Sequence, residues 1–170
     1  MTTSTAFSCH ASIKSANAVA GVDLSSWLSW ACYGLGFALA LHLAPDMAND
    51  LNGGGFGVSV IAGSVALFFA LVLVIQHQMN VSLRNTTFGE PQKLVTEGVF
   101  AMSRNPMYVA FLLPVLSIAY YSPLAAGAAA ALYLVAMNSL VISVEEQTLD
   151  AIFGGRFQRY CAATPRWLVW

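Results

Sequence analysis

Four long apolar stretches separated by polar segments dominate the chain, covering Trp27–Ala44, Gly57–Gln76, Met107–Tyr121 and Leu124–Ser143. A membrane-spanning helix needs roughly 20 apolar residues, with about 17 as the lower bound, so the second and fourth stretches qualify clearly and the first barely. The third is short and contains Pro114, which a membrane tolerates only where neighbouring groups satisfy the backbone carbonyl that proline frees. The pattern predicts an all-α integral membrane protein with about four transmembrane helices.

The polar segments between these stretches predict how the helices are connected and oriented. Ser122-Pro123 is a turn signal between the third and fourth stretches, so these two should form a helical hairpin. The segment Pro45–Phe56 is acidic and glycine-rich and lacks Lys and Arg, whereas the seven basic residues lie in segments that an even number of spans places on one side. The positive-inside rule makes that side cytoplasmic, with both termini there.

Composition agrees with a protein in the lipid bilayer and excludes several other classes. Hydrophobic residues make up 58% of the chain and charged residues 9%, against about 25% charged residues in a soluble domain. The net charge of −1 gives no basic face for nucleic acid. Three cysteines and three histidines are widely scattered, so neither a disulfide framework nor a metal site is expected. Residues 1–22 are small and polar and predict a flexible tail, which leaves 23–170 as one membrane domain.

Two polar segments, Met79–Pro106 and Glu145–Trp170, are longer than the short loops that a helix bundle needs. Glu145 and Glu146 fall where the fourth stretch leaves the membrane, and carboxylates at such depth are costly and by default mark function. Asn138 lies seven residues before Glu145, so we expect both on one helical face, two turns apart. The two segments are therefore the candidates for a site on one face of the membrane.

The C-terminal segment predicts two short helices, of which the second is amphipathic and lies along the membrane surface. Leu149, Ile152 and Phe153 have helical spacing, and Gly154-Gly155 ends that helix. Phe157 and Tyr160 then resume an apolar face, which is typical of a helix at the membrane surface.

Sequence motifs in both polar segments resemble one known family. The later block reads Glu-Glu-x-x-Leu-x-x-x-Phe-Gly from Glu145, then Tyr160, then Pro-Arg-Trp ending at Trp167. The earlier block reads Leu-Val-Thr-Glu-Gly-Val-Phe from Leu94, followed by Arg-Asn-Pro-Met-Tyr from Arg104. In this order, with a hydrophobic hairpin between them, blocks 92–108 and 145–167 resemble the isoprenylcysteine carboxyl methyltransferase family. That superfamily also includes phospholipid N-methyltransferases.

The resemblance implies an S-adenosyl-L-methionine site at the cytosolic face, with a lipophilic or small-molecule acceptor that arrives from the bilayer. It implies that Glu145 receives the cationic amino group of the cofactor and that Glu146 assists it or orients Arg104 or Arg166. The implied catalytic group is Arg104, Asn105, Glu145 and Glu146, and Arg166 and Asn138 are candidates for binding the substrate. The implied cofactor-binding positions are Gln92, Lys93, Leu94, Val95, Phe100, Asn105, Pro106, Met107, Tyr108 and Glu145.

One departure from the family pattern bears on the acceptor. Members that methylate prenylcysteine carboxylates carry an Arg four residues before the first Glu of the pair, and Val141 occupies that position here. Without that cation, a lipophilic amine, thiol or hydroxyl is favoured over a prenylated protein terminus, although Arg166 or Arg104 could substitute. Isoprenylcysteine carboxyl methylation, an NADPH-dependent membrane reductase of related fold and a non-enzymatic tetraspan packing protein remain the alternatives.

Overall fold

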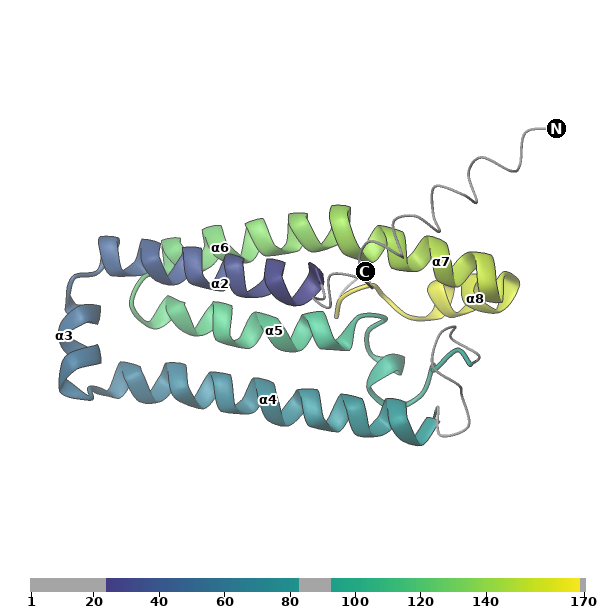
Figure 1. Ribbon diagram of the computed structural model, residues 1–170, viewed down its shortest axis with the longest axis horizontal. Helices are drawn as coiled ribbons and strands as arrows, with labels where there is room; N and C mark the ends of the chain where they lie inside the picture. The colour runs from purple at the N-terminus through teal and green to yellow at the C-terminus, as the bar shows by residue number, and fades with distance from the viewer. Residues whose placement is uncertain (1–23, 83–92, 169–170) are drawn as a thin grey trace.

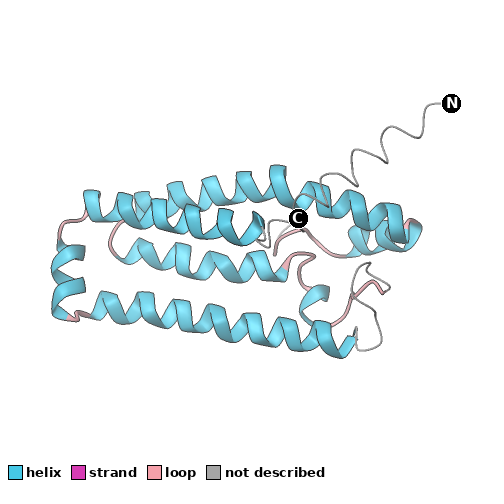
Figure 2. Ribbon diagram, viewed as in Figure 1, coloured by secondary structure: helices cyan, strands magenta, loops and turns pink. Residues whose placement is uncertain are grey.

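The computed structural model describes residues 24–82 and 93–168, and the regular structure within these ranges is entirely helical (Figures 1 and 2). The expected tail at residues 1–22 and the expected cofactor residue Gln92 lie outside the described residues. The described helices are α2 (Leu24–Leu43), α3 (Asp46–Gly53), α4 (Phe56–Ser82), α5 (Pro106–Ser117), α6 (Pro123–Ala136), α7 (Ser143–Phe153) and α8 (Gly155–Ala163). Shorter turns are the 3-10 segments η1 (Gly98–Ala101) and η2 (Ile118–Tyr120) and the π-helical turn η3 (Met137–Ile142).

The helices α2, α4, α5 and α6 run alongside one another (Figure 1). The most extensive packing joins α4 to α5 and α2 to α6, and α5 also contacts both α2 and α6. The helix α3 crosses one end of this bundle, which we call the α3 end. At the opposite end, called the site end, lie η1, α7, α8 and the C-terminal segment that follows them (Figure 1).

The all-α integral membrane fold is confirmed, and the helices differ in how far they can reach across a bilayer. Two are long and apolar enough to span, Phe56–Met79 and the continuous helix Pro123–Phe153. Trp27–Leu43 joins them only as a pair with Asp46–Gly53, from which it is bent by 108°. The expected third span, Met107–Tyr121, is the shorter apolar helix Pro106–Tyr120. By length and composition the described residues thus provide two or three spans rather than four.

The hairpin between α5 and α6 forms as predicted. The side chain of Ser122 caps α6 by accepting a hydrogen bond from the backbone N–H of Ala125 at 3.3 Å, and Pro123 occupies the first helical position. Serine before proline favours this start, because the hydroxyl satisfies an amide that the helix leaves unpaired and proline needs no partner there.

Small residues let α2 and α6 approach closely. A Cβ atom added to Gly36 of α2 would lie 2.5 Å from the Cβ of Ala129. Toward the site end the core becomes aromatic: Phe111 of α5 lies 5.0 Å from Phe68 and 5.6 Å from Tyr133, measured between ring centroids. Such ring pairs add about 0.5–1.5 kcal/mol each beyond the burial of their area. The aromatic core thus packs directly next to the site end and supports it.

Candidate functional site

The earlier sequence block is held in place by a side chain from α4. Gln78 accepts a hydrogen bond from the backbone N–H of Val99 through Oε1 at 3.2 Å. Gly98 has a φ of +64°, a conformation that glycine adopts without strain, and a Cβ atom there would lie 2.7 Å from Nε2 of Gln78. Glycine is therefore required both by the backbone turn and by the close approach of Gln78. Sequence reasoning missed Gln78, whose one signal was an amide at the end of an apolar stretch.

The two blocks meet through backbone carbonyls of residues 164–168, which we call the strap. Ser103 Oγ donates to the carbonyl of Arg166 at 3.0 Å, and Asn105 Nδ2 donates to the same oxygen at 3.1 Å. The backbone N–H of Arg104 donates to the carbonyl of Pro165 at 3.0 Å. Three consecutive residues of the first block thus bind two consecutive residues of the strap. Ser103, which sequence reasoning did not single out, is 1% exposed and also accepts from the backbone N–H of Asn105.

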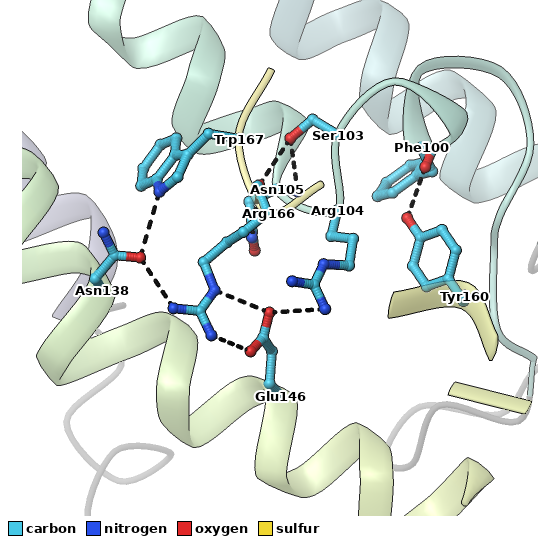
Figure 3. Close-up of polar contacts among 9 residues, drawn as sticks. All are labelled: Phe100, Ser103, Arg104, Asn105, Asn138, Glu146, Tyr160, Arg166 and Trp167. Carbon is cyan, nitrogen blue, oxygen red and sulfur yellow. Dashed lines mark hydrogen bonds and ion pairs between the residues drawn. The ribbon is translucent and has the colours of Figure 1, made fainter. Parts of the chain in front are cut away.

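Glu146 joins α7 to both blocks (Figure 3). It accepts hydrogen bonds from Nε of Arg166 at 3.1 Å and from Nη2 of the same guanidinium, and it lies 3.5 Å from Nη1 of Arg104. The side chains of Glu146 and Arg104 are 18% and 15% exposed. The hydrogen bond to Glu146 raises the pKa of Arg166, which therefore stays charged. One carboxylate thus forms ion pairs with two guanidinium groups at the centre of the cluster.

Glu145 has a different partner from Glu146 and forms a hydrogen bond with Tyr108 of the first sequence block. Tyr108, in the first turn of α5, donates its hydroxyl to Oε1 of Glu145 at 2.8 Å. The backbone carbonyl of Tyr108 accepts from the hydroxyl of Tyr133 at 3.0 Å, which ties α5 to α6. Adjacent glutamates therefore have different surroundings: Glu145 is exposed and bound to a neutral hydroxyl, whereas Glu146 is half-buried between cations.

Asn138 does not take the position expected from α-helical spacing. Its Oδ1 accepts from Nη1 of Arg166 and from Nε1 of Trp167, both at 3.3 Å, so it belongs to the cluster around Glu146 rather than to Glu145 (Figure 3). The cause is the π-helical turn Met137–Ile142. Two α-helical turns contain about 7.2 residues, and a π-turn inserts about one more, so residues eight apart come into line. The expected alignment with Glu145 was wrong by one residue.

The helix expected before Gly154-Gly155 is the end of the continuous helix Pro123–Phe153, whereas α8 forms after these glycines as a separate short helix, as predicted, and packs on the first block. Its apolar residues Phe157 and Tyr160 are buried, and the Tyr160 hydroxyl donates to the backbone carbonyl of Phe100 at 2.7 Å (Figure 3). Burial raises the pKa of Tyr160 to about 12, and the nearby charge of Arg104 opposes that shift. The hydroxyl therefore remains a hydrogen-bond donor at neutral pH. Phe100 contributes its backbone to this contact.

The structure thus brings most of the sequence-predicted residues to one end of the bundle, in two groups. The first is the cluster around Glu146, and the second is the Tyr108–Glu145 pair at the start of α5. The remaining predicted cofactor residues neighbour these groups in the sequence. Lys93 is exposed, and Leu94, Val95, Pro106 and Met107 are half-buried. The cluster consists of Ser103, Arg104, Asn105, Asn138, Glu146, Arg166 and Trp167.

The site end contains charged groups of both signs, and the described residues contain no cluster suited to a metal ion. No group of three or more His, Cys, Asp or Glu side chains suited to a metal occurs in residues 24–82 and 93–168. Within the same ranges, Nε of Arg104 is buried without a hydrogen-bond partner. A buried N–H of a guanidinium that lacks an acceptor is costly. An additional oxygen acceptor at Nε of Arg104 would satisfy this N–H.

Comparison with known proteins assigns the family. The family model described as phospholipid methyltransferase matches residues 58–156, which is more than half of the chain and runs from the start of α4 into α8. No curated protein and no solved structure matched the sequence. The match contains Arg104 to Tyr108 and the Glu145–Glu146 pair, and it agrees with the resemblance seen in both sequence blocks. The chain belongs to the phospholipid methyltransferase family, within the isoprenylcysteine carboxyl methyltransferase-like group.

Proposed function

We propose that this membrane methyltransferase transfers a methyl group from S-adenosyl-L-methionine to a lipophilic or small acceptor at the site end of its bundle. The observation that carries the proposal is the convergence of both family blocks on one cluster, in which Glu146 binds Arg104 of the first block and Arg166 of the strap. The charges also suit the cofactor, which bears a cationic amino group, a carboxylate and a sulfonium.

The described residues fit the amino-acid end of this cofactor. Glu145 would hold the ammonium group by a charge-assisted hydrogen bond, with Tyr108 orienting the carboxylate from 2.8 Å. The Nε–H of Arg104, which has no acceptor, would donate a hydrogen bond to the carboxylate of the cofactor, and this buried donor would then be satisfied. Half-buried Leu94 and Val95 would pack against the apolar parts of the cofactor. The bound cofactor supplies an electrophilic methyl group on sulfur.

The residues of this chain contribute binding and orientation rather than proton transfer. Asn105 cannot titrate near neutral pH, and its amide is engaged with the carbonyl of Arg166. It therefore acts as a structural link between block and strap, not as a general base. Methyl transfer is an in-line displacement, and orientation alone can lower such barriers by about 7–11 kcal/mol in favourable cases.

The acceptor in this proposal is an amine, a thiol or a hydroxyl rather than a carboxylate. Val141 occupies the position of the carboxylate-binding Arg of prenylcysteine methylating members, and it is buried in the π-helical turn. The two cations that could replace it, Arg104 and Arg166, are both bound to Glu146. In this proposal the remaining donor of Arg104 serves the carboxylate of the cofactor, and recruiting Arg166 would break its ion pair with Glu146, so isoprenylcysteine carboxyl methylation is the less favoured acceptor chemistry.

The site end is proposed to face the cytoplasm, with both termini on that side. The basic residues of the described ranges lie at this end, and the connection at the α3 end contains Asp46 and Asp50 but no Lys or Arg. These basic residues are Lys93, Arg104, Arg156, Arg159 and Arg166. Basic residues concentrate in cytoplasmic segments of membrane proteins.

Titration of the purified protein with S-adenosylhomocysteine and with NADPH tests the cofactor. We expect binding of S-adenosylhomocysteine and a loss of at least about tenfold in affinity for Glu145→Gln, because a charge-assisted bond contributes about 1.5–3 kcal/mol. Glu97→Gln, an exposed glutamate in the same part of the chain, is the matched control. Binding of NADPH alone would refute methyl transfer in favour of a reductase, and binding of neither would favour a packing protein.

Transfer of labelled methyl then tests the acceptor. The panel contains lipid extracts, small thiols and prenylcysteine analogues, each incubated with the protein and labelled S-adenosylmethionine. We expect label in the amine-containing lipids or thiols. Label confined to prenylcysteine carboxylates would contradict the acceptor class and leave the methyltransferase activity standing.

A further inference from the structure

Two consecutive residues of the strap are bound by one side-chain oxygen on the long membrane helix. Oδ1 of Asn138 accepts from Nη1 of Arg166 and from Nε1 of Trp167, each at 3.3 Å (Figure 3). Asn138 lies inside the span Pro123–Phe153, where a polar side chain is costly unless it has partners and a use. Its partners are both in the strap.

The π-helical turn is what makes this contact possible together with the contact at Glu146. In an uninterrupted α-helix, Asn138 would be in line with Glu145 seven residues later. The turn Met137–Ile142 shifts the register by about one residue, so that Asn138 and Glu146 both reach the guanidinium of Arg166. π-turns inside α-helices frequently occur at functional sites.

The strap in turn holds the first sequence block. The carbonyl of Arg166 accepts from Ser103 Oγ and Asn105 Nδ2, at 3.0 and 3.1 Å. Asn105 directly precedes the first turn of α5, and Tyr108 lies in that turn. The hydroxyl of Tyr108 in turn orients Glu145. A continuous set of hydrogen bonds therefore runs from Asn138 through the strap to the residues proposed to hold the cofactor.

We propose that Asn138 is a positioning residue for the cofactor site, acting through Arg166 and Trp167 and not through contact with the acceptor. The inference rests on the proposed function and deepens it. Sequence reasoning assigned Asn138 to substrate binding, but its carbonyl oxygen is occupied by two donors from the strap. Its contribution is to keep the strap seated on Ser103 and Asn105.

Two substitutions at this position separate hydrogen-bond acceptance from mere packing. Asn138→Leu keeps a similar volume and removes the acceptor. Asn138→Asp keeps acceptor oxygens for both donors and should restore the contact. Thr148→Ala is the control within the same continuous helix, since its hydroxyl bonds the carbonyl of Val144 one turn earlier. Trp167→Phe removes one donor from the opposite partner and keeps an aromatic ring, which provides a second test should Asn138→Leu fail to fold.

The first measurement is the release of the strap, which needs no cofactor. Trypsin cleaves after Arg166 once the strap leaves the site, and cleavage after exposed Arg156 of α8 is the internal reference. Each lost hydrogen bond changes an equilibrium by about threefold. Asn138→Leu loses two bonds and Trp167→Phe loses one, so we expect the relative rate of cleavage after Arg166 to rise about tenfold and about threefold, respectively. Asn138→Asp and Thr148→Ala should remain within about twofold of the parent, since neither removes an acceptor from the strap.

The second measurement is steady-state methyl transfer with the acceptor found active in the panel. A positioning role predicts a KM for S-adenosylmethionine about tenfold higher in Asn138→Leu, nearly unchanged kcat and acceptor KM, and rescue by Asn138→Asp. Unchanged cleavage after Arg166, or an Asn138→Asp protein as impaired as Asn138→Leu, would overturn the inference. A change confined to the acceptor KM would also overturn it and return Asn138 to substrate binding. Failure of the parent to bind S-adenosylhomocysteine would refute the proposed function, whereas the proteolysis result would still decide the strap contact.

Discussion

Replacing Glu146 by Gln should destabilise the protein more than any other single change of one carboxylate at the site end. The substitution keeps the size of the side chain and removes the charge that two guanidinium groups share. The ion pair with Arg104 has both side chains mostly buried, at 18% and 15% exposure, and leaving a mostly buried charge without its ion-pair partner costs about 1.5–3 kcal/mol. The pair with Arg166, which is 36% exposed, adds at most about 1 kcal/mol because water screens it.

The sum, about 1.5–4 kcal/mol, corresponds to a fall in Tm of about 3–16 °C at 2–4 °C per kcal/mol for a chain of this size. Thermal denaturation in detergent measures it, with Glu97→Gln, an exposed glutamate, as the control expected to change little. The double variant Arg104→Met/Glu146→Gln should lose less than the sum of its single changes, because it no longer leaves one buried charge without a partner. A Tm of Glu146→Gln within about 2 °C of the control would refute the reasoning, since screening would then have removed the whole interaction.

Three further substitutions test the packing and the titration behaviour of the site end and the bundle. The raised pKa of Tyr160 stabilises the folded protein below pH 10, and this stabilisation is lost as the pH rises from 10 to about 12 and the hydroxyl ionises. The Tm of Tyr160→Phe should therefore fall less over that range than the Tm of the parent. Gly36→Leu should lower the Tm because its Cβ has no room on the facing helix, whereas Gly34→Ala, with open space, should not; equal effects would argue against close packing there. Gly98→Ala should cost about 1–2 kcal/mol from its φ of +64°, and Gly155→Ala, which meets no neighbour, is its control in the same Tm assay.

The helices and their order were predictable because apolar composition and proline positions determine them directly. Pro123 begins α6 after Ser122, and the two glycines after Phe153 separate α7 from α8, as the turn signals indicated. The number of spans was less predictable. The third apolar stretch is confined between Pro106 and the turn at Ser122, so its helix is short however apolar its residues are.

The site was predictable as a set of residues but not as a set of contacts. Motif resemblance named Arg104, Glu146 and Arg166, and the structure places them in one ion-pair cluster. The π-helical turn left no trace in the sequence, because every residue of Met137–Ile142 is compatible with an α-helix. Contacts to backbone carbonyls, such as those of Ser103, are likewise invisible because a carbonyl has no sequence identity.

The shortness of α5 has a consequence for how a lipid could react. At the α3 end, a Cβ atom on Gly57 of α4 would collide with Tyr121, and Tyr121 also donates to Asp50 at 3.1 Å, so α4 and the far end of α5 are level there. Tyr108 lies 13 residues before Tyr121, about 20 Å along the helical axis, whereas the hydrocarbon layer is about 30 Å thick. The reacting centre would then be recessed below the headgroup level. A lipid would reach it by lateral diffusion, without lifting its acyl chains into water, and turnover should respond to bilayer thickness.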